Sequence, residues 1–131
     1  MPCRRRRGCP LPDDSQWARR RRLRLAEIAE RIVIVDPRSG TTTGDLWRGA
    51  ERVPRFIESG DVVGWLGLIA AGRGVGITAA ATADHHPGPG VVYRPVTDGP
   101  RIAVRLAWWR DARPRGLDDL VDAVTARYAE V

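Results

Sequence analysis

Lysine is absent from this sequence of 131 residues, and all 22 basic residues are arginine. Cysteine is also scarce. Cys3 and Cys9 lie in an arginine-rich start with no histidine nearby, so their spacing indicates neither a zinc site nor a disulfide framework. We interpret both as reduced thiols without a function of their own.

Long hydrophobic runs are missing as well. No run approaches the roughly 20 apolar residues that a membrane span needs, and the basic start lacks the apolar stretch of a secretory signal. We therefore expect a cytoplasmic protein without a membrane contact. The length predicts one domain, with a core large enough to fold without disulfides.

Catalytic patterns are equally sparse. No serine stands in a G-x-S-x-G turn, and His85 and His86 are adjacent, so their side chains point in different directions. Asp118 and Asp119 fall in the first turn of a predicted helix, where carboxylates complement the helix dipole. We predict that the chain is not an enzyme and needs no metal or cofactor.

Positive charge is unevenly distributed. Residues 1–24 carry a net charge of +7, and the remaining residues carry −1. A basic start of this kind is either a solvated arm or an arm that binds nucleic acid through its phosphates. Only Trp17 provides an aromatic side chain there, which favours the solvated arm.

The hydrophobic pattern alternates short helices with strands, which indicates an α/β fold. Helices are expected at 23–31, 61–72 and 117–128, and strands at 31–35, 55–58, 75–79, 91–96 and 102–109. Asp61 is expected to cap the second helix and Gly72 to end it. The segment GRGVG, residues 72–76, then closes a helix and opens a strand. This order predicts a tight turn, with Gly74 allowing close backbone packing, and it does not favour a phosphate-binding loop.

A cluster of hydroxyl groups follows the first strand of the helix-flanked sheet. The segment RSGTTTGDLW, residues 38–47, places Ser39, Thr41, Thr42 and Thr43 around two glycines. Ligands usually bind at the carboxyl end of such a strand, where free N–H groups and hydroxyls converge. The alternative is that one hydroxyl only caps the next helix. The spacing leaves both interpretations open.

Four segments together resemble one known family, and they are GCPLPDDSQWARRRRLRLAEIAER, VIVDPRSGTTTGDLW, WLGLIAAGRGVGITAAATADHHPGPGVVYRPV and VRLAWWRDARP. From about Arg7 onward the chain is similar to the C-terminal part of the substrate-binding (effector-binding) domain of LysR-type transcriptional regulators. The resemblance implies an α/β fold like that of type 2 periplasmic binding proteins. Residues 7–101 would form lobe II, and residues 102–131 would return to an incomplete lobe I. The resemblance assigns no role to residues 1–6.

The resemblance also implies a function. The chain would be the effector-sensing portion of a DNA-binding regulator, without the winged helix-turn-helix, as a fragment, a truncated gene or the product of a misplaced start codon. Its effector would be a small polar or anionic molecule, contacted by Ser39, Gly40, Thr41 and Thr42. DNA would be bound only through the missing helix-turn-helix, and the full-length regulator would be a homo-oligomer.

Two further expectations follow from an incomplete lobe I. The site would be half of a cleft, so affinity for the effector would be weak. The segment 102–109 would have unpaired backbone groups and an exposed Trp108 or Trp109. Two other hypotheses remain open: a stand-alone small-molecule-binding or interaction protein that completes its sheet with a partner, and a nucleic-acid binder that acts through its arginine tail.

Overall fold

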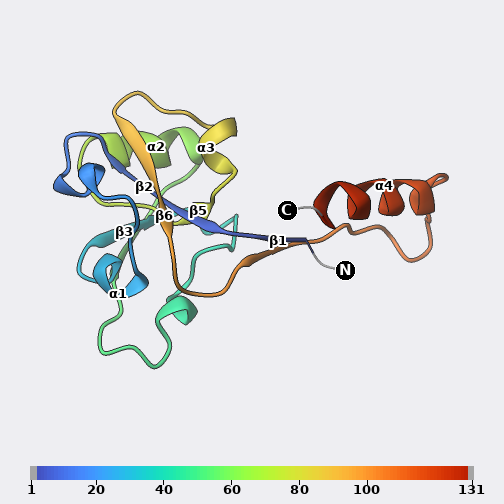
Figure 1. The fold of residues 1–131 in the computed structure, drawn as a ribbon, viewed down its shortest axis with the longest axis horizontal. Coiled ribbons are helices and arrows are strands. Elements are labelled where there is room, and N and C mark those ends of the chain that lie inside the picture. The colour runs from blue at the N-terminus through green and yellow to red at the C-terminus, as the bar shows by residue number, and fades with distance from the viewer. Residues whose placement is uncertain (1–2, 130–131) are drawn as a thin grey trace. The chain divides into compact units, whose positions relative to one another are not determined.

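The computed structural model describes residues 3–129, and the chain divides into two compact units (Figure 1). We call residues 6–102 the main unit. The terminal unit joins the described residues 3–5 to residues 103–129. Among residues 3–129 no helix has both the length and the apolar character to cross a membrane.

The main unit has a three-stranded antiparallel sheet in the order β5-β2-β6. The central strand β2 (Arg7–Pro12) is buried throughout, and it pairs along its whole length with β6 (Val91–Val96). The short strand β5 (Thr78–Ala79) pairs with Arg7 and Gly8 on the other edge. The arginine-rich start therefore continues directly into the centre of the fold.

A second sheet consists of the parallel strands β3 (Ile32–Val35) and β4 (Arg55–Glu58), aligned from Ile32 opposite Arg55. The strand β3 is covered on both faces, as its apolar sequence predicts. Val33 lies in the larger hydrophobic cluster, and Ile34 packs with Trp65 and Ile69 in a second cluster. The strand expected at 75–79 is shorter than predicted, because Val75 makes only an isolated bridge to Val33.

The helix expected at 61–72 begins and ends where local signals predict. The helix expected at 23–31 is reduced to the single turn Leu25–Ile28, because Leu23 makes a bridge to Val96 instead. In α2 (Val62–Ala70) the Asp61 carboxylate accepts a hydrogen bond from the Gly64 N–H at 2.6 Å, and Gly72 ends the helix with a φ of +75°. The other helical segments of the main unit are single turns, namely η1 (Gln16–Arg19), α1 (Leu25–Ile28), η2 (Gly44–Trp47) and α3 (Thr82–His85). In the view of Figure 1, α2 and α3 lie in the upper part of the main unit, level with the upper end of β6, and α1 lies in its lower part.

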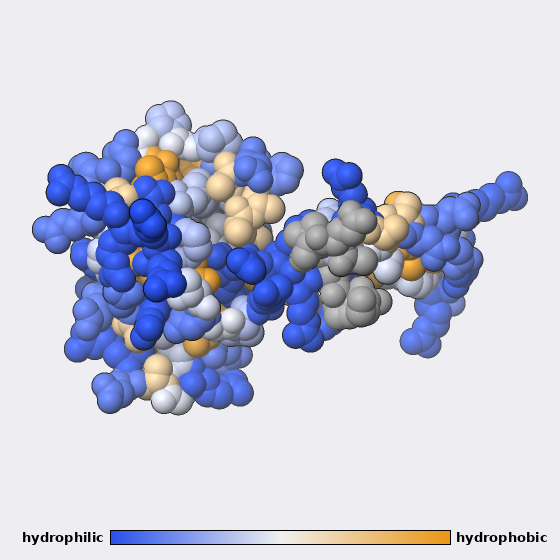
Figure 2. All heavy atoms as spheres, in the orientation of Figure 1, coloured by the Kyte–Doolittle hydropathy of each residue, from blue (hydrophilic) through white to orange (hydrophobic). Residues whose placement is uncertain are grey.

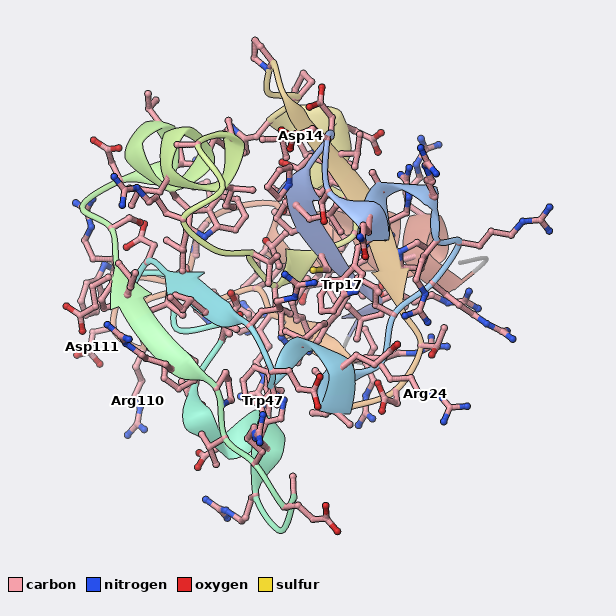
Figure 3. All side chains as sticks on the ribbon, turned by 90° about the vertical axis from the view of Figure 1, so that its left-hand side faces the viewer. Asp14, Trp17, Arg24, Trp47, Arg110 and Asp111 are labelled. Carbon is pink, nitrogen blue, oxygen red and sulfur yellow. The ribbon has the colours of Figure 1, made fainter. Side chains whose placement is uncertain are left out.

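Trp47 anchors the larger hydrophobic cluster. It is 1% exposed, and its indole N–H donates a hydrogen bond to the Leu25 carbonyl oxygen at 2.8 Å. Figure 3 shows it beside α1, and its ring meets the Phe56 ring edge-on at a centroid distance of 5.9 Å. The visible face of the main unit is mostly hydrophilic (Figure 2), so this apolar cluster lies inside.

The terminal unit pairs the strand β1 (Cys3–Arg5) with β7 (Ile102–Val104) and ends in α4 (Leu117–Ala129). The strand predicted at 102–109 ends at Val104, so the prediction is wrong for the residues that follow. The expectation of unpaired backbone groups is wrong for residues 102–104, because they pair with β1. The exposed tryptophans are confirmed, because Trp108 is 45% and Trp109 is 83% exposed. The Arg5 guanidinium stacks over the Tyr128 ring at 4.3 Å. The described part of the basic start is therefore not the solvated arm that the sequence favoured.

Cys9 is fully buried in the central strand, and burial raises the pKa of its thiol to about 12. In a Cys3→Ala variant, we expect no reaction of the native thiol with Ellman's reagent at pH 8 and complete reaction after denaturation. Because the unfolded thiol loses its proton near pH 9, we also expect stability to fall as the pH rises above 9. Rapid labelling of the native chain would contradict this burial.

Candidate functional site

The hydroxyl groups after β3 have separate roles. The Thr43 hydroxyl accepts a hydrogen bond from the Asp45 N–H at 3.3 Å and so caps η2. Ser39 turns back, and its hydroxyl donates to the Asp36 carbonyl oxygen at 3.0 Å. The capping interpretation is therefore correct for Thr43, and the other hydroxyls are left for a different role.

Ser39, Thr41 and Thr42 line a pocket of about 190 Å³ in the main unit, which we call the hydroxyl pocket. Gly40 does not line it. Its φ of +63° is a conformation that glycine adopts without strain, and it turns the chain between Ser39 and Thr41. The other lining residues are Ile34, Val35, Asp36, Val62, Trp65, Ile77, Thr78, Thr82 and His86.

Hydrogen bonds hold most of these hydroxyls in place. Thr42 donates to the Ile77 carbonyl oxygen at 2.7 Å, and the hydroxyls of Thr78 and Thr82 lie 2.9 Å apart. The Thr41 hydroxyl has one contact, with the Ser39 hydroxyl at 3.3 Å. Because Ser39 gives its only proton to Asp36, Thr41 is the donor in this long contact, and a ligand acceptor can replace Ser39 as its partner.

Trp65 forms an apolar wall of the hydroxyl pocket. Its indole N–H donates to the Ile34 carbonyl oxygen at 2.8 Å, which fixes the ring at the end of β3. Gly76 makes room for it, because a side chain at this position would overlap the Trp65 ring. The pocket thus combines the apolar surface of an aromatic ring with several neutral hydroxyls and the acidic Asp36.

The nine other lining residues were not predicted as site residues, and they include Trp65, Thr78, Thr82 and His86. His86 is exposed and directly follows α3, and its carbonyl oxygen accepts a hydrogen bond from the Tyr93 hydroxyl at 2.7 Å. Across residues 3–129, His, Cys, Asp and Glu side chains form no group of three that could hold a metal ion. The arrangement suits hydrogen bonding to a small molecule.

The profile of the LysR substrate binding domain matches residues 3–129, so the chain belongs to this family. The match begins at Cys3, a few residues before the resemblance expected from the sequence. A comparison with curated proteins finds no match.

Solved structures of LysR-family regulators have the same fold as this chain. HinK from Pseudomonas aeruginosa matches 98% of it with a TM-score of 0.70 and 19% identity, over 46% of its own chain. The BenM effector binding domain with benzoate matches 97% of this chain, over 61% of its own, with a TM-score of 0.71 and 20% identity. The effector binding domain of QuiR in complex with shikimate matches 99%, over 64% of its own chain, with a TM-score of 0.62 and 13% identity. The predicted periplasmic-binding-protein-like fold is confirmed, and the chain spans less than two thirds of these relatives.

Proposed function

We propose that this chain is the effector-sensing portion of a LysR-family transcription regulator, with the hydroxyl pocket as its effector site. The observation that carries this proposal is the position of Ser39, Thr41 and Thr42 around one pocket directly after β3. Residues 7–101 would correspond to lobe II and residues 102–131 to part of lobe I. DNA contact and oligomerisation would belong to the whole regulator.

The pocket favours a polar molecule with a ring-shaped body. Benzoate and shikimate, which occupy the BenM and QuiR structures, share a six-membered ring and a carboxylate. In this chain the ring would pack on Trp65, and hydroxyls would donate to the carboxylate. Effector binding would then act by favouring one arrangement of the regulator over another through unequal contacts in the two states.

The pocket predicts weak binding by this chain alone. Its volume of about 190 Å³ is below the range of roughly 300–1,000 Å³ that is usual for ligand sites. We expect dissociation constants of about 1 mM or higher for benzoate and shikimate, or roughly −4 kcal/mol. Isothermal titration measures this directly, and micromolar affinity would contradict it.

A pair of matched variants tests the site itself. Thr41→Val keeps the shape of the side chain but removes its hydroxyl, so we expect affinity to fall about two- to tenfold. Thr43→Val is the control, because Thr43 caps η2 and does not line the pocket. Equal affinities of the two variants for the better ligand would show that the hydroxyl pocket is not the site.

A further inference from the structure

A second cavity of about 560 Å³ lies in the main unit and shares no lining residue with the hydroxyl pocket. Four arginines line it, namely Arg6, Arg7, Arg94 and Arg101. We call it the arginine pocket. Asp98 is the one acidic residue in its lining, so the lining residues carry a formal net charge of +3.

Arg7 is a buried cation without a carboxylate partner among the described residues. Its side chain belongs to the central strand and is part of a residue that is 8% exposed. Its guanidinium donates to the Pro100 and Thr41 carbonyl oxygens, each at 2.7 Å. Burial lowers the pKa of Arg7, but an arginine remains charged at neutral pH. A buried charge is costly unless a counter-charge accompanies it.

Arg94 is half-buried, and its guanidinium also contacts backbone carbonyl oxygens. Its guanidinium donates to the Ala18 carbonyl oxygen at 2.5 and 3.2 Å and to the Tyr93 carbonyl oxygen at 2.9 Å. The only carboxylate of the lining is already engaged, because one oxygen of Asp98 accepts the Leu25 N–H at 2.8 Å. The two exposed arginines, Arg6 and Arg101, add further positive charge at the cavity.

We propose that the arginine pocket binds a small organic anion with two acidic groups, such as a dicarboxylate. The guanidinium fork matches a carboxylate in geometry and in charge, and two acidic groups offset most of the net charge of the lining. The volume lies within the usual range for organic ligands and exceeds the needs of a single inorganic ion. Apolar side chains between the arginines, including Ala83, Pro95 and Val96, contact the body of the anion.

The test is an NMR titration of the full chain with phthalate, a dianion, and with phthalamide, its neutral counterpart. We expect phthalate to shift the amide signals of Gly8, Ala83 and Gly99, with an affinity that falls as salt is added. Phthalamide should cause no such shifts. Equal binding of the two probes, or no shift by phthalate at 20 mM, would overturn the proposal.

Matched variants locate the probe. Arg101→Gln removes an exposed guanidinium of the pocket, and we expect phthalate affinity to fall about three- to tenfold. Arg52→Gln is the control, since Arg52 is an exposed arginine of the main unit outside the pocket. If phthalate shifts only the amide signals of Thr41, Thr42 and Thr82, this proposal is wrong, and the proposed effector site in the hydroxyl pocket is unaffected. A loss of phthalate affinity in Arg101→Gln but not in Arg52→Gln would support the arginine pocket. This result would hold even if Thr41→Val does not change the affinity for benzoate or shikimate.

Discussion

Replacing Trp47 by alanine is expected to lower the free energy of unfolding by about 3–5 kcal/mol, as is usual for a buried tryptophan. Trp47 is 1% exposed and joins the segment after β3 to α1 and to Phe56. Its removal leaves a cavity in the larger hydrophobic cluster and takes one of two hydrogen-bond donors from the Leu25 carbonyl oxygen, which keeps the Ala29 N–H.

The exposed Trp109 provides a control of the same residue type. Trp109→Ala should change the free energy of unfolding by no more than about 0.5 kcal/mol. Urea denaturation followed by circular dichroism measures both variants without relying on tryptophan fluorescence. Trp47→Phe keeps most of the ring and loses the N–H, so its cost should lie between the other two. Equal stabilities of Trp47→Ala and Trp109→Ala would contradict the described core.

Replacing Gly74 by alanine is expected to cost about 1–3 kcal/mol, because an added methyl group overpacks the chain. A Cβ at this position would lie 2.5 Å from the carbonyl oxygen of Ile32, a backbone atom of β3. That oxygen also accepts the Val75 N–H at 2.9 Å, so it cannot move away without weakening the bridge between the two segments. The glycine turn is therefore a packing requirement.

Gly67 is the matched control for this prediction. It lies in the middle of α2 with open space around its missing Cβ. Gly67→Ala should stabilise the chain by up to about 1 kcal/mol, because alanine favours the helix. Thermal and urea unfolding of the two variants should therefore move in opposite directions. Shifts of the same sign and size would contradict the close approach of Gly74 to β3.

Local patterns predicted the elements whose signals lie within their own sequence. The strand β3 is a run of β-branched residues, and α2 has an N-cap, an apolar face and a terminal glycine. The segment after Val104 shows the limit of such patterns. Its alternating apolar residues favour a strand, but a strand also needs a partner, and β1 pairs only with residues 102–104.

The candidate site was predictable only where its residues are neighbours in sequence. Ser39, Thr41 and Thr42 follow β3 directly, so a known tendency of α/β sheets pointed to them. Trp65, Thr78, Thr82 and His86 come from other elements, and only the folded chain brings them to the pocket. The arginine pocket also depends on distant pairing, because β2 and β6 lie about 80 residues apart in the sequence.

An NMR titration with a panel of cyclic carboxylates that includes benzoate and shikimate tests the central claim most directly. At millimolar concentrations, at least one ligand should shift the amide signals of Thr41, Thr42 and Thr82 together. Thr41→Val should weaken that response, and Thr43→Val should leave it unchanged. Shifts that avoid these three residues, or no response to any ligand of the panel, would contradict an effector site in the hydroxyl pocket.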